Sequence, residues 1–207
     1  MERIIAKQAD LEAVSRTIAR AFATDPVWAV ALARPDGQTD HHESYWRLFV
    51  EGAAAHGTVF LADGGAAVSV WLPPGADELG AAGRRELERY LDEALDPAAV
   101  VAMHELYDRF EASRSSVPAE HAYLSLLATH PDHRGRGIGQ DLLAADLLDW
   151  DLRRIPAYLE STNPGNDHRY MRAGFVPIGA FTAIRDPAPI TAMWRDIGGS
   201  GTAGIRG

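Results

Sequence analysis

The segment between Leu126 and Gln140 restricts the fold of this chain more than any other. It reads LLATHPDHRGRGIGQ, in which an apolar stretch is followed by a proline and by three glycines at alternate positions. Proline has no N–H to donate to a sheet, so a strand is predicted to end there. Glycine lets backbone N–H groups close around an anion, and the N-terminus of a following helix adds about half a positive charge. The segment therefore predicts a strand, an anion-binding loop and a helix, in that order.

Two familiar phosphate loops do not fit this segment. A Walker A loop ends in Gly-Lys-Ser/Thr, whereas this loop ends in Gly139-Gln140-Asp141. A dinucleotide fingerprint would require its last glycine where Gln140 or Leu142 stands. The loop is thus predicted to bind a phosphate group in another way.

The loop is basic although the chain is acidic. Arg134 and Arg136 flank the glycines and His130 and His133 precede them, whereas the whole chain has 20 Lys and Arg against 29 Asp and Glu. A tight turn without a ligand also explains the glycines alone, and the basic residues favour the anion site. The net charge of −9 argues against binding to a nucleic-acid backbone, which needs a basic surface.

Several other classes are excluded by what the sequence lacks. The chain has no cysteine, which excludes disulfides, zinc–thiolate sites and a cysteine nucleophile. It has no run of about 18 apolar residues and no continuous apolar stretch at its N-terminus. We therefore expect a cytoplasmic protein that does not span a membrane.

Alternating apolar patterns predict a mixed α/β domain. Residues 123–129 are apolar on both faces and predict a central strand buried on both sides. Residues 76–118 show no strand pattern and predict a helical insertion. Residues 1–196 are expected to form one domain, and 197–207 a flexible Gly-rich tail. The other predicted helices cover 10–23, 28–32, 40–55, 139–152 and 167–173, and the other predicted strands 4–6, 58–62, 66–72, 155–159, 175–184 and 190–194.

Four motifs in one order resemble the GNAT superfamily of N-acetyltransferases. They are Arg134-x-x-Gly137-x-Gly139 after an apolar strand, the segments 21–26 and 158–166, and Tyr170-x-x-x-Gly174-Phe175. Within the superfamily, the sequence resembles the branch that contains puromycin N-acetyltransferase, through Trp-Leu-Pro-Pro-Gly at 71–75, the helical insertion and the 159–166 loop. The resemblance implies a largely antiparallel central sheet, splayed at the CoA site and flanked by helices, with the insertion at about 76–118.

The resemblance also implies acetyl-CoA as the co-substrate. The end of the apolar strand would pair with the pantetheine arm, and the glycine loop would hold the pyrophosphate on its backbone amides. Asn166 would hydrogen-bond the pantetheine, although an asparagine after Pro164-Gly165 is also a common turn residue. The residues implied for acetyl-CoA are Leu127, Ala128, Thr129, Arg134, Gly135, Arg136, Gly137, Ile138, Gly139, Gln140, Asn166 and Tyr170.

Two side chains are implied for the chemistry. Tyr170 matches a tyrosine that lies near the CoA sulfur and gives the leaving thiolate a proton or a hydrogen bond. Glu160 is the first candidate for the base that takes a proton from the acceptor amine. Glu120 and His121 are the alternative bases, acting through water. The reaction can also proceed without a single base. Tyr170 is also explained as a helix residue that packs on the core.

The acceptor is expected between the first two long helices and the helical insertion. Phe22, Asp25, Trp28, Tyr45 and Trp46 are candidates to line this site, although the aromatic residues are equally explained as core. Asp25 could bind an ammonium group or could simply end a helix before Pro26. Adjacent His41 and His42 do not share a helix face, so they are expected on the surface, and no metal site is predicted.

The sequence therefore predicts an N-acetyltransferase that transfers the acetyl group of acetyl-CoA to a primary amine of a small molecule. The amine would attack directly in a ternary complex. Two alternatives stay open, namely an acetyltransferase for protein N-termini or lysines, and a non-catalytic acetyl-CoA sensor. Dimers are frequent in the superfamily, so a homodimer is a further expectation.

Overall fold

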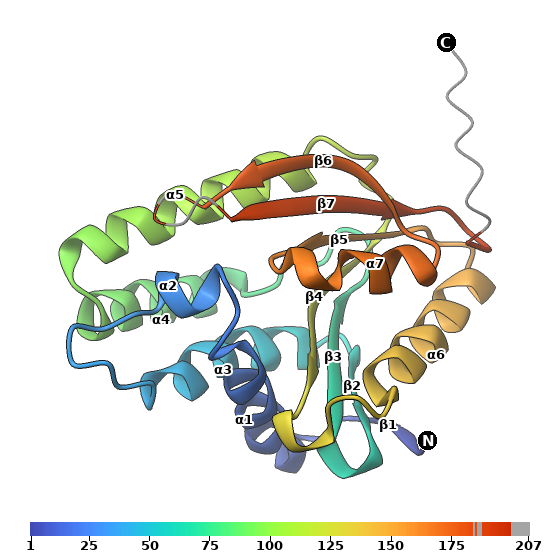
Figure 1. The fold of residues 1–207 in the computed structure, drawn as a ribbon, viewed down its shortest axis with the longest axis horizontal. Helices are drawn as coiled ribbons and strands as arrows, with labels where there is room; N and C mark the ends of the chain where they lie inside the picture. The colour runs from blue at the N-terminus through green and yellow to red at the C-terminus, as the bar shows by residue number, and fades with distance from the viewer. Residues whose placement is uncertain (184, 186–187, 200–207) are drawn as a thin grey trace.

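The computed structural model describes residues 1–183, 185 and 188–199 and shows one sheet with helices on both faces (Figure 1). The strands are β1 (Arg3–Ile5), β2 (Val59–Ala62), β3 (Ala67–Leu72), β4 (Ala122–Thr129), β5 (Ala157–Ser161), β6 (Val176–Thr182) and β7 (Pro189–Arg195). The helices are α1 (Leu11–Phe22), α2 (Trp28–Ala31), α3 (His41–Ala54), α4 (Gly80–Ala94), α5 (Pro97–Arg114), α6 (Ile138–Leu152) and α7 (Pro164–Arg172), with short 3-10 turns at Gln8–Asp10, Asp63–Gly65 and Pro131–His133.

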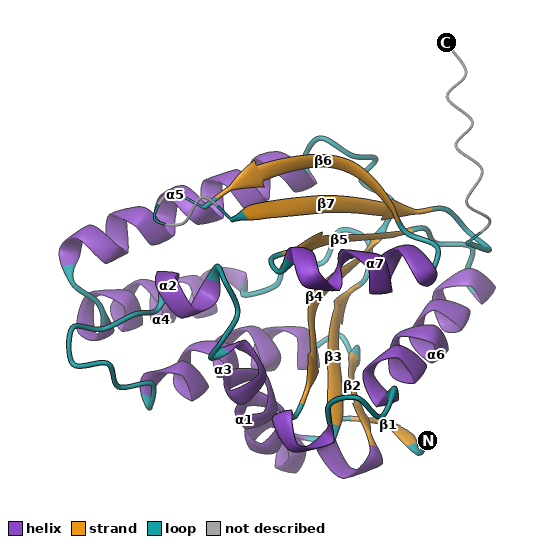
Figure 2. Cartoon of the chain, viewed as in Figure 1, coloured by secondary structure: helices purple, strands orange, loops and turns teal. Residues whose placement is uncertain are grey.

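The sheet has seven strands in the order β1-β2-β3-β4-β5-β7-β6. All neighbouring strands are antiparallel except β4 and β5, which are parallel. Figure 2 shows that the axes of β2, β3 and β4 lie roughly along one line, whereas those of β5, β6 and β7 lie across it. The predicted mixed, largely antiparallel sheet is therefore confirmed.

Helices cover the sheet in two layers with separate cores. On one face, α1 and α3 pack their apolar stripes, including Val14, Ile18 and Val50, against β2, β3 and β4. On the other face, α6 packs Leu143 and Trp150 in a second cluster. The helical spacing that predicts these stripes is thus confirmed, because burial of an apolar stripe is what holds a helix on a sheet.

Strand β4 is less completely buried than predicted. Residues at even positions are buried, whereas those at odd positions, from Tyr123 to Thr129, are only half-buried. The register with β3 jumps from Val70 opposite Leu126 to Trp71 opposite Leu124, so Ser125 is the extra residue of a β-bulge. The bulge switches the faces of the strand, because Ala122 and Leu124 belong to the core beside α6 and Leu126 and Ala128 to the core beside α1 and α3. The half-buried residues line the open cleft, which explains the difference.

The parallel pair β4–β5 opens almost as soon as it forms. Only Ala122 pairs with Ala157 and Tyr123 with Tyr158, after which the two strands diverge. The last residues of β4 therefore keep unpaired backbone groups on the side of β5. This splayed pair forms the base of the cleft described below.

The predicted insertion is helical, as α4 and α5 confirm. Asp96 caps α5 by accepting a hydrogen bond from the Ala99 N–H (2.9 Å), and Pro97 occupies the first helical position. Among the described residues, no helix is long and apolar enough to cross a membrane. The predicted end of β6 at residue 184 and most of the predicted tail, residues 200–207, lie outside the described residues.

Two predicted features are displaced in the structure. β5 begins two residues later than predicted because Pro156 has no N–H for the sheet, and α7 begins at Pro164 because Asn163 caps it. His41 and His42 were expected on the surface, but both are buried. His41 Nε2 lies 2.8 Å from the Leu32 carbonyl oxygen, so the pair helps to hold the end of α2 on α3.

Candidate active site

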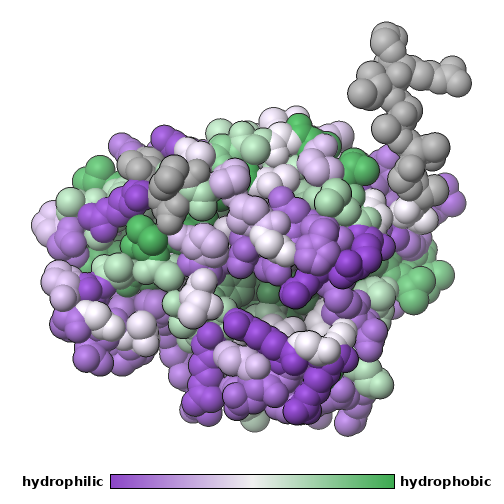
Figure 3. All heavy atoms as spheres, in the orientation of Figure 1, coloured by the Kyte–Doolittle hydropathy of each residue, from purple (hydrophilic) through white to green (hydrophobic). Residues whose placement is uncertain are grey.

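A large cleft of about 1320 Å³ runs across the molecule where β4 and β5 separate. It extends from the loop between β4 and α6 to the helices α3, α4 and α5. Figure 3 shows the hollow at the centre of this face, with hydrophobic side chains at its floor and hydrophilic ones at its rims. The cleft is large enough for two substrates at once.

The glycine loop forms one end of the cleft. Gly135 and Gly137 have φ angles of +79° and +80°, a conformation that side chains with a Cβ rarely adopt, and nothing lies within 4 Å of the place where a Cβ would be. Gly137 directly precedes the first turn of α6. Open backbone N–H groups and a helix N-terminus together make a site that fits a pyrophosphate.

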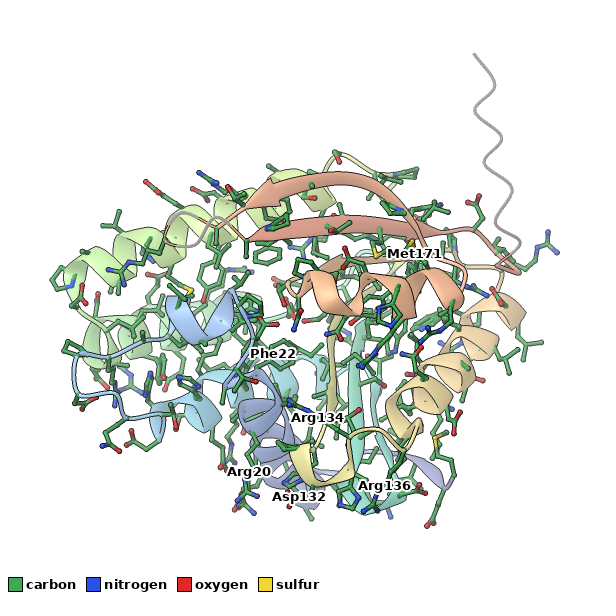
Figure 4. The ribbon with its side chains drawn as sticks, viewed as in Figure 1. Arg20, Phe22, Asp132, Arg134, Arg136 and Met171 are labelled. Carbon is green, nitrogen blue, oxygen red and sulfur yellow. The ribbon has the colours of Figure 1, made fainter. Side chains whose placement is uncertain are left out.

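The side chains around this loop differ in their placement. Arg134 donates to the carbonyl oxygen of Ala21 (2.9 Å) at the end of α1 and so joins the loop to that helix. Figure 4 shows Arg134 beside Phe22 and Arg20, with Arg136 on the outer side of the loop. Arg136 is not among the residues that line the cleft, unlike the other residues predicted in this loop.

Most residues predicted to hold the co-substrate do line the cleft. A Cβ on Gly139 would lie 2.4 Å from Thr129 Oγ1, so the glycine allows α6 to begin directly against the end of β4. The structure brings the strand end, the loop and α7 together around one channel. The predicted cofactor residues that line it are Leu127, Ala128, Thr129, Arg134, Gly135, Gly137, Ile138, Gly139, Gln140, Asn166 and Tyr170.

Tyr170 projects from α7 into this channel. Its ring packs against Phe175 with ring centroids 6.2 Å apart, and its hydroxyl makes no hydrogen bond to another described residue. Burial, together with the negative charges of Asp25 and Asp167, raises the pKa of the Tyr170 phenol above its usual value. The hydroxyl therefore stays protonated at neutral pH and can donate a hydrogen bond.

Glu160 on β5 is the most perturbed carboxyl group of the cleft. The Tyr158 hydroxyl donates to its Oε1 (2.7 Å), while Oε2 is buried and makes no hydrogen bond of normal geometry among the described residues. Burial raises the pKa of Glu160 to about 7, opposed by the hydroxyls of Tyr158 and Tyr123 and by the guanidinium of Arg114. A carboxyl group with this pKa can accept a proton near neutral pH.

The alternative bases lie differently. His121 lines the cleft, and its Nδ1 lies 2.6 Å from the Pro118 carbonyl oxygen. Glu120 is exposed and is not among the cleft-lining residues. Of the three candidates, Glu160 combines a place in the cleft with a buried oxygen that makes no hydrogen bond of normal geometry to the described residues.

Sequence reasoning missed a second group around Glu160. Glu78, in the segment between β3 and α4, accepts a hydrogen bond from the hydroxyl of Ser125 at the β-bulge. Arg114 of α5 lies over the ring of Tyr123, 4.8 Å from its centroid. No local motif marks these residues, because three separate elements bring them together.

The predicted acceptor residues meet at the other end of the cleft. Phe22, Trp28, Tyr45 and Trp46 line it and pack against one another, with Trp28 and Trp46 ring centroids 5.0 Å apart. Trp28, Tyr45 and Trp46 are buried and also belong to the core, and their role toward an acceptor stays a prediction.

Asp25 lines the cleft but is occupied by protein contacts. Its Oδ1 accepts from the backbone N–H groups of Val27 (3.0 Å) and Trp28 (3.1 Å), and its Oδ2 accepts from the Thr162 hydroxyl (2.9 Å). Burial raises the pKa of Asp25 despite these hydrogen bonds. The carboxyl thus holds the turn before α2 and joins it to the end of β5.

This architecture defines a class. An open, mixed sheet that splays at its parallel pair, with a glycine loop at one end of the gap, is the fold of GNAT acyltransferases. In agreement, residues 91–177 match the family model described as an acetyltransferase (GNAT) domain. The matched segment contains β4, the glycine loop, α6, β5 and α7.

Solved structures share the fold over nearly the whole chain. An acetyltransferase from Corynebacterium glutamicum, titled histone acetyltransferase HPA2 and related acetyltransferase, is 24% identical, with a TM-score of 0.67 over 94% of this chain and 95% of that one. Arylalkylamine N-acetyltransferase 2 from Aedes aegypti is 14% identical, with a TM-score of 0.65 over 95% and 98%.

Polyamine N-acetyltransferase from Drosophila melanogaster is 17% identical, with a TM-score of 0.61 over 93% of this chain and 96% of that one. Residues 91–177 therefore match a GNAT acetyltransferase domain, and this match together with the shared fold supports an acyltransferase.

Proposed function

We propose that the protein transfers the acetyl group of acetyl-CoA to the primary amine of a small molecule. The observation that carries this proposal is Glu160, a buried carboxyl with an unsatisfied oxygen in the cleft and a pKa of about 7. An amine is mostly protonated at neutral pH and must lose a proton before it can attack. A base of this kind beside a channel that fits CoA supports amine acylation.

In the proposed reaction, the acceptor nitrogen loses a proton to Glu160 and forms a bond to the acetyl carbonyl carbon. The carbon–sulfur bond breaks, and the electron pair leaves on the CoA sulfur. Tyr170 donates a hydrogen bond to this thiolate, which takes up a proton. No covalent intermediate with the enzyme forms, so the chain needs no nucleophile of its own.

Positioning supplies the rest of the rate. The unpaired edge of β4 can hold the pantetheine arm as an added strand, and Gly135 and Gly137 leave room for the pyrophosphate at the start of α6. A co-substrate held at both places has little freedom left, which brings the thioester close to the acceptor at low entropic cost.

The names of the structural neighbours support a small amine. Several are N-acetyltransferases for arylalkylamines, agmatine or polyamines. One neighbour carries a histone acetyltransferase title, which keeps a protein acceptor as the alternative. The sequence resemblance to the puromycin N-acetyltransferase branch adds aminonucleosides to the acceptors to be tested.

The test follows the release of free CoA thiol with a thiol reagent. The protein has no cysteine, so it adds no thiol background. The panel holds aminonucleosides, aminoglycosides, polyamines, arylalkylamines, amino acids and short basic peptides, and mass spectrometry of the products locates the acetyl group. Transfer to small amines supports the proposal. Transfer only to peptides would replace it with a protein acetyltransferase, and acetyl-CoA binding without any transfer would indicate a sensor.

A further inference from the structure

The charges that line the cleft are unevenly distributed among its elements. The glycine loop and α7 contribute His133, Arg134, Arg169 and Arg172 and, among the described residues, no lining acid. The segment 73–88 and α5 contribute five lining acids and two arginines, namely Asp77, Glu78, Glu88, Asp108, Glu111, Arg84 and Arg114. The end of the cleft away from the glycine loop therefore attracts cations.

The two arginines at this end already have acidic partners. Arg84 donates to both oxygens of Asp77 (2.8 and 2.7 Å), and Arg114 donates to Glu111 (2.6 Å). Within the described part of the chain, neither Glu78 nor Glu160 forms an ion pair with any basic group. These two cleft-lining carboxyl groups therefore lie within the influence of Arg114, which pairs with Glu111, but have no ion pair of their own.

The fold places Glu78 in the cleft by two independent contacts. A Cβ on Gly52 of α3 would lie 1.8 Å from the Glu78 carbonyl oxygen, so only glycine lets this segment come so close to α3. The bulge at Ser125 directs a hydroxyl to the Glu78 carboxyl group. The carboxyl is held on the wall of the cleft and has no ion pair of its own among the described residues.

Glu78 also lies near Glu160 but is not needed as a second base. Each of the two feels the charge of Arg114, and the negative charge of Glu78 raises the pKa of Glu160. Glu160 can take the proton of only one amine. A second carboxylate near it, whose charge acts on Tyr45 and Tyr107, has the chemistry that binds a further organic cation beside aromatic rings.

We propose that Glu78 forms a second cation site, so that the preferred acceptor carries two positively charged groups, one reacting beside Glu160 and one bound at Glu78. Diamines and amino-guanidines have this chemistry. This inference rests on the proposed function, because it names the acceptor class of the same cleft. An acceptor with one amine lacks the group that would neutralise Glu78.

The test compares matched amines under steady-state conditions. The probes are diaminopropane, putrescine, cadaverine and agmatine against propylamine, butylamine and pentylamine, and the readout is the ratio of kcat/KM for the best dication to that of its monoamine. We expect a ratio of about ten or more, since a charge-assisted contact contributes about 1.5–3 kcal/mol and about 1.4 kcal/mol is tenfold. Glu78→Gln should lower this ratio about tenfold.

Two further variants separate charge from structure. Ser125→Ala removes the hydroxyl that orients Glu78 and should lower the ratio by a smaller factor, whereas Glu105→Gln, on the exposed side of α5, should leave it unchanged. Equal kcat/KM for diamines and monoamines, or a Glu78→Gln variant with an unchanged ratio, overturns the second cation site. Acetylation of another amine in the panel would then leave the proposed function standing, whereas no transfer to any amine overturns both.

Discussion

The buried carboxyl of Glu160 should make the enzyme less stable at the pH at which it works best. Its pKa is raised from 4.5 to about 7, and each pKa unit corresponds to about 1.4 kcal/mol. The ionised carboxylate therefore destabilises the folded state by about 3 kcal/mol at most. The value is an upper bound because Glu160 as a whole residue is only half-buried, although its Oε2 is buried.

The direction with pH follows from which state holds the proton. Below a pH of about 4.5 the carboxyl is protonated in both states and contributes nothing. Between about 4.5 and about 7 the unfolded chain loses its proton first, so the contribution to the free energy of unfolding falls as pH rises. Above about 7 the carboxylate is ionised in both states and the full penalty remains.

Glu160→Gln removes this penalty and the proposed base together. The variant should match the wild type in stability at about pH 4.5 and exceed it by up to about 3 kcal/mol at about pH 8.5. For a domain of this size the gain in Tm would be about 6–12 °C. Urea denaturation at several pH values measures the difference, and Glu105→Gln is the control that should show no pH-dependent gain.

The same group sets the pH dependence of activity. For the wild type, kcat/KM should rise with pH through about 7, because only the ionised carboxylate accepts a proton, and the Glu160→Gln variant should lose most of its activity. A Glu160→Gln variant that is less stable than the wild type at about pH 8.5 would refute the reasoning, since the charged form would then be stabilised by its surroundings.

Three other predictions follow from single contacts. Tyr170→Phe should lower kcat about tenfold or more while the Kd for acetyl-CoA stays within about twofold, because only the hydrogen bond to the leaving thiolate is lost; calorimetric titration measures the Kd, and equal kcat would exclude the role. Gly139→Ala should raise the KM for acetyl-CoA, since its Cβ would meet Thr129 Oγ1 at 2.4 Å; the added change Thr129→Ala should restore it, and a KM that stays high would place the effect elsewhere. Asp146→Ala should cost about 3 kcal/mol in urea denaturation, because the buried carboxyl accepts from Ser69, Trp71 and Arg3 (2.6, 2.9 and 2.7 Å), and a loss below about 1 kcal/mol would show that water replaces it.

Features that depend on neighbouring residues could be predicted from the sequence. The order of Pro131, the glycines and the apolar helix is enough for the strand, loop and helix at 122–152, because proline and glycine act on their own backbone. The aromatic residues at helical spacing in α3 likewise predicted a buried stripe. The segment 91–177 that matches the GNAT domain contains the strand, glycine loop and helix that these local patterns predict.

Features that depend on contacts between elements distant in the sequence could be seen only in the tertiary structure. Glu78, Ser125 and Arg114 come from three elements, and no spacing in the chain shows that they share one cleft. The burial of His41 and His42 depends on the position of Leu32, and the partial burial of every second residue of β4 depends on the bulge and on the early end of its pairing with β5.

The sequence by itself determined which segments become strands, helices and an anion loop, and it marked Tyr170 and Glu160 by their motifs. Only the tertiary structure decided what surrounds these groups, and therefore which of them carries an unusual proton affinity. The physical reason is that backbone preference acts between neighbours in the chain, whereas desolvation and charge act through space. Glu160 illustrates this, since its pKa of about 7 arises from burial and from residues on β4, β5, α5 and the segment after β3.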